Sequence, residues 1–577
     1  MYLFHIFRSF LPLHNPIGFG AADLVELALA ACLLFVVLAN PPAKRLAALL
    51  MGRPAICMTA LAALPVILRL VLLPQSPAPM PAGADDFSYV LLADTLTHLR
   101  LANPTHPMYR FFETNFVLQQ PTYSSIFPLG QGLVLALGHA LFRNFWAGVV
   151  LSVALLCSLS YWMLRGWTTE GWALVGGLLA VIQFGPLSRW MNTYWGGAVS
   201  AIAGCLVFGA LPRLRASWRN RDAAVLGVGM GIQLLTRPFE FTLLVLSVIL
   251  FFIPAIRDRV IWKLVGTRAA TALATMLPAI VLMLLQNKSV TGSWTTVPYM
   301  VGRYEYGVPV TFTFQRNPRP HRTLTAEQEL DYKAQAGIHG ERTDTLTTYL
   351  QRLAYRIRYY RFFFLPPLFF VLPFFFASER RLAVVYITST VVLFALGTNF
   401  YPYFYSHYIA ALTSLFLLAS VMGLERLSKI TIAGFRTGHD VSRLIVLLCL
   451  THFLFWYTLH LIDSDDISDV FDYETSSYIN SDDPEGRIDI DSQLAKAPGR
   501  QLVFVRYGPK HEFEEWIHNA ANIDSARVVW ACDRGATEDQ QLIRYFHDRN
   551  VWLVEPDLDP PKLTRYQPQA PVFEDVH

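Results

Sequence analysis

The chain has 577 residues, of which 53% are hydrophobic and only 16% are charged, and its net charge is +4. A soluble domain carries about 25% charged residues, and a single core stops growing beyond about 250–300 residues. The composition therefore excludes a purely soluble enzyme, a disordered protein and a fibre, and predicts a polytopic membrane protein. Residues 461–577 hold 24 acidic and 11 basic residues, which indicates an apolar, basic membrane body followed by an acidic soluble tail.

Twelve apolar segments are candidates for membrane spans, each of which needs about 20 residues. They are 21–39, 54–73, 145–164, 169–187, 194–211, 222–237, 238–256, 268–286, 361–377, 382–398, 406–422 and 443–460. The first segment begins late and ends without a cleavage site of small residues, so it predicts a retained span and not a signal peptide. The six cysteines show neither a disulfide framework nor a metal-type spacing.

A thirteenth apolar segment, 126–142, is short and contains Pro128 and several glycines. If it does not cross the membrane, eighteen Lys and Arg of the short links fall on one side, in agreement with the positive-inside rule. We therefore predict an interfacial or re-entrant helix on the outer face, with both termini outside. Loops 74–144 and 287–360 and the tail 461–577 are then extracytoplasmic, in an integral inner or plasma membrane protein.

The tail predicts a small α/β domain at 496–577, which an acidic linker at 461–495 joins to a membrane domain at 1–460. Strand patterns at 501–506, 527–532 and 551–555 alternate with helix patterns at 511–519 and 537–549. This alternation predicts a βαβαβ unit with a short parallel sheet. The unit lacks G-x-G-x-x-G and a P-loop, so no nucleotide site is expected. No nucleic-acid partner is expected either, because topology explains the Lys and Arg of the body.

Asp85 and Asp86 are adjacent carboxylates about a dozen residues after a predicted span, and a helical pattern follows at 87–101. Asp is favoured at the start of a helix, so the pair can serve to stabilise that helix. It can also provide a general base at the membrane surface, with the second carboxylate orienting the first or holding a cation. The two interpretations are compatible, because a position at a helix start fixes a carboxylate rigidly.

Three arginines near predicted spans are candidates for phosphate binding. Arg237 lies in a tight link between two spans, where a charge is a functional hypothesis by default, and its fork of donors suits a phosphate. The alternative is a snorkelling arginine paired with Glu240. Arg352 and Arg356 share a helix face on the side where positive charge is not required for topology. They could bind one lipid phosphate specifically, or lipid headgroups in general.

The link SRWMNTYWGG at 188–197 is rich in aromatic and amide side chains. Aromatic residues at a membrane interface are usually anchors, but stacking rings and amides also suit a sugar site. A lone histidine, such as His407, is more often structural than catalytic. The candidates for substrate binding are Asn192, Tyr194, Trp195, Glu240, His407 and Tyr408.

In this order, the motifs resemble those of the GT-C superfamily of membrane glycosyltransferases, whose relatives include protein mannosyltransferases and lipid A aminoarabinose transferases. The chain is most similar to a poorly characterised bacterial group, and the resemblance covers most of its length. The segments that carry it are DDFSYVLLADTLTHLRLANPTHP (85–107), QQPTYSSIFPLGQG (119–132), NTYWGG (192–197), TRPFE (236–240), VTGSWTTVPY (290–299) and SHYIA (406–410).

The resemblance implies transfer of a hexose or pentose from a polyprenyl-phosphate donor to a cell-envelope acceptor on the outer face of the membrane. Membrane lipid would surround the protein. Asp85 matches the catalytic Asp of the superfamily's first large outer loop, and Asp86 stands where Glu is frequent. Asp85 would be the general base of a single, inverting displacement. Arg237, with Arg352 or Arg356, would stabilise the departing phosphate.

Cofactor use and two other classes of protein are alternatives to this interpretation. Some GT-C members use a divalent metal, but with two visible carboxylates no cofactor is favoured here. The main rival is a transporter or flippase of a lipid-linked or envelope substrate, and a non-catalytic scaffold is a third class. The candidate polar residues cluster at the outer ends of spans and no internal repeat is visible, which favours the transferase.

Overall fold

The computed structural model describes residues 21–39, 52–81, 83–253, 259–340, 343–462, 486–509, 511 and 515–567. The chain divides into two compact units, each assembled from three separate stretches. Unit 1 comprises residues 1–79, 146–281 and 344–480, and unit 2 comprises residues 80–145, 282–343 and 481–577.

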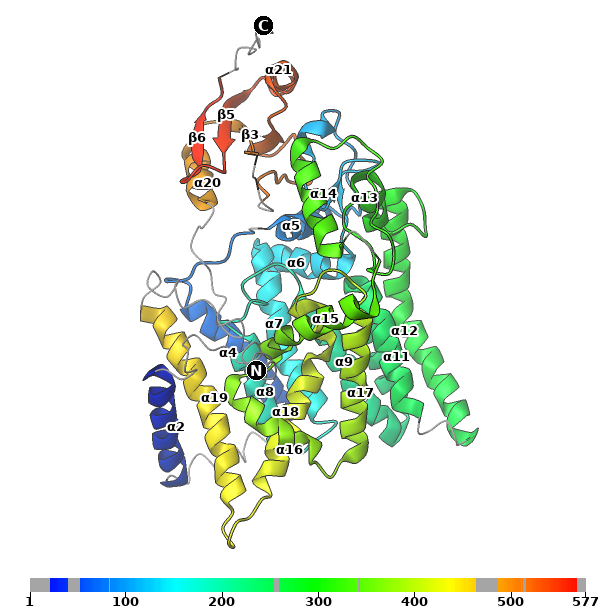
Figure 1. Ribbon diagram of the computed structural model, residues 1–577, viewed down its shortest axis with the longest axis vertical. Helices are drawn as coiled ribbons and strands as arrows, with labels where there is room; N and C mark the ends of the chain where they lie inside the picture. The colour runs from blue at the N-terminus through cyan, green and yellow to red at the C-terminus, as the bar shows by residue number, and fades with distance from the viewer. Residues whose placement is uncertain are drawn as a thin grey trace. The chain divides into compact units, whose positions relative to one another are not determined.

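Unit 1 is built of helices (Figure 1). The longer ones are α2 (Ala21–Ala39), α4 (Pro54–Val71), α7 (Phe145–Leu164), α8 (Glu170–Phe184), α9 (Gly197–Ser217), α10 (Asn220–Thr236), α11 (Pro238–Phe252), α12 (Arg259–Thr291), α17 (Arg381–Thr398), α18 (Thr413–Ser428) and α19 (Thr437–Ile462). The shorter ones are α15 (Leu346–Arg356), η3 (Ile357–Phe363), η4 (Pro366–Val371), α16 (Leu372–Phe376) and η5 (Ser406–Leu412). The end of α12 belongs to unit 2.

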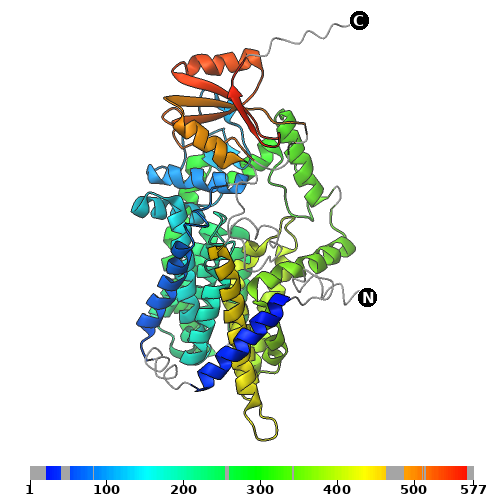
Figure 2. The same ribbon diagram turned by 90° about the vertical axis from the view of Figure 1, so that its left-hand side faces the viewer.

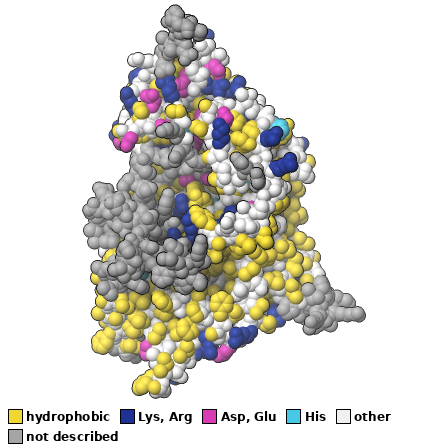
Figure 3. All heavy atoms as spheres, viewed as in Figure 1, with side chains coloured by type: hydrophobic (Ala, Val, Ile, Leu, Met, Phe, Trp, Pro, Cys, Tyr) yellow, Lys and Arg dark blue, Asp and Glu magenta, His cyan; other side chains and the backbone are white. Residues whose placement is uncertain are grey.

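The predicted polytopic membrane fold is confirmed. Seven helices of the described chain are long and apolar enough to cross a membrane, or eight if one bent pair forms a single span. Helices occur in all twelve predicted segments, but α8, α10 and α11 have only 15 to 17 residues, so the number of twelve spans stays a prediction. On the face shown in Figure 3, hydrophobic side chains gather over the region of the unit 1 helices, as expected for a surface in contact with lipid.

The segment predicted as a span at 361–377 contains a sharp break near its start. The helical pieces Leu346–Phe363 and Pro366–Phe376 meet at an angle of 108°. Leu365, which precedes two prolines, is extended, with φ −64° and ψ 143°. A residue before proline avoids the helical region, and proline supplies no N–H for the helix ladder, so the chain turns at this point.

The segment predicted not to cross, 126–142, forms α6 (Leu129–Phe142) in unit 2. Its 14 residues make a helix of about 21 Å, which is shorter than the hydrocarbon core of about 30 Å. It packs against α5 (Ala84–Thr97). Gly132 allows this close approach, because a Cβ there would lie 2.5 Å from Cγ of Leu92. The side of the membrane on which α6 lies stays a prediction.

Unit 2 combines helices with a four-stranded sheet. Besides α5 and α6 it contains η1 (Tyr109–Phe112), β1 (Val117–Leu118), β2 (Ser124–Ser125), α13 (Pro298–Tyr306), α14 (Ala326–His339), α20 (Arg487–Lys496), β3 (Arg500–Val505), β4 (Val528–Cys532), α21 (Ala536–Tyr545), β5 (Arg549–Glu555) and β6 (Lys562–Arg565). The sheet has the order β4-β3-β5-β6. Its first three strands are parallel, and β6 is antiparallel to β5.

The predicted parallel strands and the second predicted helix of the tail are confirmed. α20 lies partly inside the predicted linker, most of which falls on residues outside the described ranges, and β6 was not predicted. The predicted helix at 511–519 is wrong: the described residues there, 511 and 515–519, are not helical. Side chains satisfy backbone donors instead, since Trp516 N–H donates to the Tyr507 hydroxyl and Ile517 N–H to the Glu515 carboxylate.

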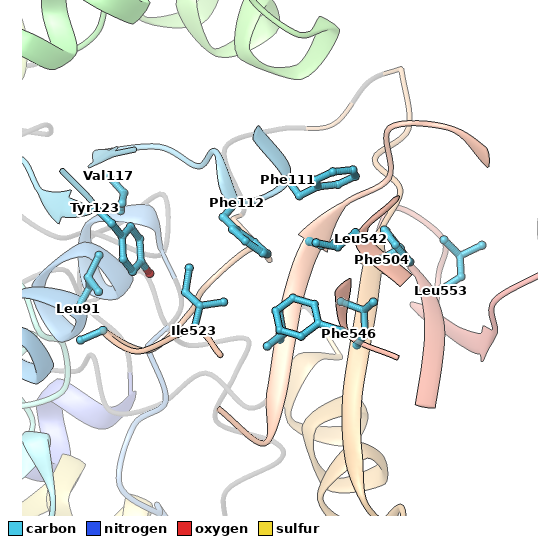
Figure 4. Packing of buried hydrophobic residues seen from close by; sticks show 14 residues of the cluster. Leu91, Phe111, Phe112, Val117, Tyr123, Phe504, Ile523, Leu542, Phe546 and Leu553 are labelled. Carbon is cyan, nitrogen blue, oxygen red and sulfur yellow. The ribbon is translucent and has the colours of Figure 1, made fainter. Parts of the chain in front are cut away.

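Alternate residues of β3 face two different layers. Leu502 and Phe504 share a hydrophobic core with α21 and with residues of the first large loop, among them Leu91, Phe112 and Tyr123 (Figure 4). Val503 and Val505 pack instead with Ile490 and Leu494 of α20. The two helices therefore cover opposite faces of the sheet (Figure 2). The C-terminal sheet and the loop that carries Asp85 consequently fold around one common core.

Candidate functional site

The Asp pair lies in the first turn of α5, in unit 2. The N-cap residue is Gly83, so Asp85 and Asp86 are the second and third residues of the helix. Asp86 is buried, whereas Asp85 is half-buried. Unpaired N–H groups and the helix dipole favour negative charge in a first turn. The position therefore supports both roles expected of the pair, which are stabilising the helix and presenting a carboxylate at a fixed place.

α5 is anchored along its length. Near its start, the Ser88 hydroxyl donates to the Phe116 carbonyl, and its oxygen lies 2.7 Å from that of the Ser125 hydroxyl. Near its end, a carboxylate oxygen of Asp94 accepts a hydrogen bond of 2.7 Å from the N–H of Ala521. These contacts fix the position of α5 from Ser88 to Asp94, directly after the first turn that carries the two carboxylates.

Phe87 directly follows the Asp pair and stacks on the C-terminal region. Its ring lies 4.3 Å from the ring of His518, with 15° between the planes. Burial lowers the pKa of His518 to about 3, and the charge of Arg487 acts in the same direction. His518 is therefore neutral at physiological pH, with its Nδ1 donating to the Trp516 carbonyl at 2.8 Å. It offers a flat stacking surface and not a base.

In unit 1, side chains from three short segments between helices come together. The guanidinium of Arg237, between α10 and α11, lies 4.6 Å from the ring centroid of Tyr408. The ring of His407 lies 4.6 Å from that of Tyr408 and meets the ring of Trp195 edge-on at 5.5 Å. Glu240 is buried in the first turn of α11. Four of the predicted substrate-binding residues and Arg237 thus belong to the same group of links.

Arg189 is a member of this group that the sequence prediction did not select. Its guanidinium lies 4.7 Å from the ring centroid of Trp195 and 5.6 Å from that of Tyr405. The sequence contained a signal for it, because Arg189 is an arginine in a link predicted to lie on the outer side, where the positive-inside rule does not require one. With Arg237, it places two cations beside one set of aromatic rings, which is a suitable arrangement for a phosphate.

Asn192 and Tyr194 are held by hydrogen bonds within unit 1. The Asn192 amide donates to two carbonyls of its own link at 2.9 Å each and accepts from Arg69 at 3.0 Å. Arg69 also donates to the carbonyls of Ser76 and Pro77, and the Tyr194 hydroxyl donates to the Pro79 carbonyl at 3.0 Å. These bonds hold the segment that leads toward the Asp pair. Sugar binding by Asn192 and Tyr194 stays a prediction.

Arg352 and Arg356 both bind the turn that follows α17. Arg356 is buried and donates to the carbonyls of residues 398, 401 and 402. Arg352 donates to the Asn399 carbonyl at 3.0 Å and forms an ion pair with Asp344. Because the last carbonyls of a helix need external donors, the two arginines shape the link before His407. Their predicted contact with the donor phosphate stays a prediction.

No group of three or more His, Cys, Asp or Glu side chains within the described ranges is arranged to hold a metal ion. The two carboxylates of Asp85 and Asp86 are oxygen ligands of the type that Mg²⁺ accepts together with water and phosphate. The expectation that no metal is needed stays a prediction.

No family model matches the chain, and no curated protein matches it in sequence. Several solved structures are similar to it. ArnT from Cupriavidus metallidurans in the apo state is 13% identical, with 85% of this chain and 92% of that chain covered and a TM-score of 0.49. The same protein bound to undecaprenyl phosphate is 13% identical, with 86% and 92% covered and a TM-score of 0.49.

The oligosaccharyltransferase of Archaeoglobus fulgidus, in complex with zinc and sulfate, is also similar in structure. It is 10% identical, with 85% of this chain and 67% of that chain covered and a TM-score of 0.48. At this level of identity the likeness concerns the fold alone.

Proposed function

We propose that the protein is a membrane glycosyltransferase that moves a sugar from a polyprenyl-phosphate donor to a hydroxyl of a cell-envelope acceptor, on the outer face of the membrane. The observation that carries this proposal is the carboxylate pair in the first turn of α5, a helix that is anchored near both of its ends. A rigidly held carboxylate of this kind suits a general base.

In the proposed reaction Asp85 accepts the proton of the acceptor hydroxyl while the hydroxyl oxygen attacks the anomeric carbon of the donor sugar. The bond from that carbon to the lipid phosphate breaks in the same step, so the configuration inverts. Asp85 is half-buried and therefore accessible to an acceptor, whereas the buried Asp86 orients its neighbour. If a divalent metal is bound when substrate is present, the two carboxylates would hold it, and its charge would stabilise the leaving phosphate.

The leaving phosphate is assigned to Arg237 and to Arg189. One guanidinium group can bind two phosphate oxygens through two parallel N–H donors. The ring of Tyr408 lies beside the guanidinium of Arg237, and the ring of Trp195 lies beside that of Arg189, which favours these positions through cation–π interactions. Stabilising the charge that develops on the departing group lowers the barrier directly. Trp195, His407 and Tyr408 would provide stacking surfaces for the sugar, with Glu240 as a hydrogen-bond acceptor.

The proposal is tested with the purified full-length protein in nanodiscs and a panel of polyprenyl-phosphate sugars labelled in the sugar. Release of the sugar from one donor, with product of inverted anomeric configuration, is the expected result. Movement of labelled lipid between leaflets without cleavage would instead identify a flippase. An intact donor in the presence of every extracted envelope acceptor, with no movement of lipid, would contradict both functions.

A further inference from the structure

One buried arginine of the C-terminal region contacts the chain next to the Asp pair. Arg487 begins α20 and is 4% exposed. Its guanidinium donates to the Glu515 carbonyl at 2.6 Å and, at 3.4 Å, to the Pro81 carbonyl. The central carbon of the guanidinium lies 4.9 Å from the ring centroids of both Phe87 and Trp516. The guanidinium is therefore held by carbonyls and by aromatic rings.

These contacts touch the chain on both sides of the Asp pair. Pro81 lies four residues before Asp85, and Phe87 directly follows Asp86. The N-cap residue Gly83 provides no side-chain cap for α5, and a Cβ at that position would meet no atom within 4 Å. The contacts of Arg487 with Pro81 and Phe87 therefore add support to the entry of the chain into α5.

We propose that Arg487 is a positioning residue that holds Asp85 and Asp86 in their working orientation, so that the C-terminal region is a structural part of the active site. This inference rests on the proposed function for the role of Asp85 as the base. Arg487 takes no proton and forms no bond with the substrate. Its effect is geometric, and a displacement of a catalytic group by about 1 Å can lower the rate about 100-fold.

Lysine cannot replace Arg487 in this arrangement. A guanidinium is planar, stacks on aromatic faces and directs several donors in fixed directions, whereas an ammonium group is a compact point charge. Lysine could reach one of the two carbonyls, but it would lose the flat packing between Phe87 and Trp516. Arg487→Lys should therefore show an intermediate effect, and Arg487→Met, which keeps the length and removes the donors, should show the full effect.

Arg527 offers a matched control in the same region of the chain. Its guanidinium also donates to two backbone carbonyls, those of Ala495 and Ala497, at 2.7 and 2.9 Å. Arg527→Met removes two hydrogen bonds of the same kind, which bind the C-terminal region to itself, although Arg527 is exposed. An effect of losing carbonyl contacts within that region would therefore appear in this control, whereas loss of positioning would appear only at Arg487.

The experiment measures two properties of the full-length wild type and of the Arg487→Lys, Arg487→Met and Arg527→Met variants. The first is amide hydrogen exchange of peptides that cover residues 83–97, and the second is kcat and KM for sugar release. We expect exchange at residues 87–90, the first hydrogen-bonded amides of α5, to rise about tenfold in Arg487→Met and less in Arg487→Lys. We expect kcat to fall about 10- to 100-fold with little change in KM, as for loss of an orienting group. Arg527→Met should behave as wild type.

Unchanged exchange in Arg487→Met, or an unchanged kcat, would overturn the positioning role. If Arg487→Met does not fold, Arg487→Lys decides by the same two measurements. If the wild type releases no sugar from any donor, the proposed function fails, and the contrast in exchange between the Arg487 and Arg527 variants still decides whether Arg487 fixes this turn.

Discussion

The N–H of Ala521 donates a hydrogen bond of 2.7 Å to the carboxylate of Asp94, a residue that is 427 positions away in the chain. Asp94 belongs to the helix whose first turn carries the Asp pair. The bond therefore ties the C-terminal region to the element that presents the proposed base. The bond and the shared core of Leu91, Phe112 and Phe504 both connect these two distant parts of the chain.

Substitution of Asp94 by Ala should weaken this attachment. A hydrogen bond to a charged group contributes about 1.5–3 kcal/mol to stability, and the variant also leaves the Ala521 N–H without its acceptor. We expect the free energy of unfolding to fall by about that amount, with faster hydrogen exchange at residues 519–523. Asp94→Asn, which keeps an acceptor oxygen, should lose less, and equal losses in both variants would contradict the assignment.

Glu327 should make the stability of the protein depend on pH. Burial, followed by the charge of Glu515, raises the pKa of the Glu327 carboxyl to about 8 from an ordinary value of 4.5. The folded protein then retains a proton that the unfolded chain has lost. The contribution of this group to the free energy of unfolding is complete below about pH 4.5 and is lost as the pH rises to about 8. Burial raises the pKa of Asp331 to about 7, in the same direction.

Glu327→Gln tests this dependence, because an amide of the same shape cannot ionise. We expect its Tm to fall less than that of wild type between pH 5 and pH 8, and the variant to be the more stable one at pH 8. Glu329→Gln is the matched control, since Glu329 is on the same helix and pairs with Lys333 in solvent. Parallel curves for wild type and Glu327→Gln would contradict the role of Glu327.

The close packing of α9 on η5 should be sensitive to a single methyl group. A Cβ at Gly204 would lie 1.8 Å from the Ala411 carbonyl oxygen, whereas a Cβ at Gly266 would meet nothing within 4 Å. Overpacking of this kind costs about 1–3 kcal/mol, and it would displace the segment that carries His407 and Tyr408. Gly204→Ala should therefore lower both Tm and sugar release, and Gly266→Ala should change neither.

Arg237 should be the arginine on which sugar release depends most strongly. Removal of one donor to a developing negative charge lowers kcat about 10²- to 10³-fold. We expect this loss in Arg237→Met and a smaller one in Arg237→Lys, which retains the charge without the fork of donors. Arg215→Met is the control and should release sugar at the wild-type rate, because Arg215 also lies near an aromatic ring, 5.9 Å from the centroid of Phe251, but is not assigned to the phosphate. Equal rates for wild type and Arg237→Met would remove Arg237 from the mechanism.

Local patterns in the sequence predicted much of this fold. The apolar segments 21–39 and 145–164 coincide with α2 and α7, and the alternating segments of the tail became β3, β4 and β5. These elements depend on apolar periodicity, which the sequence displays directly. The break near Leu365 was also visible, since two prolines follow it, but the apolar character of 361–377 outweighed them in the prediction.

Contacts between distant residues were not predictable in this way. The loss of the expected helix at 511–519 depends on the hydroxyl of Tyr507 and the carboxylate of Glu515, which satisfy backbone donors of that segment. The binding of Arg356 to carbonyls of the turn after α17 likewise needs two parts of the chain to meet. A helical spacing shows that two arginines share a face, but it does not show what lies opposite that face.

The measurement that tests the central claim most directly is sugar release by wild type, Asp85→Asn and Asp440→Asn, with the donor identified in the panel. Asp440 is a matched control, because it also lies in the first turn of a helix, α19. The account predicts release by wild type and Asp440→Asn, and a loss of at least about 100-fold in Asp85→Asn, with donor binding and Tm preserved. Release by Asp85→Asn at the wild-type rate would contradict it.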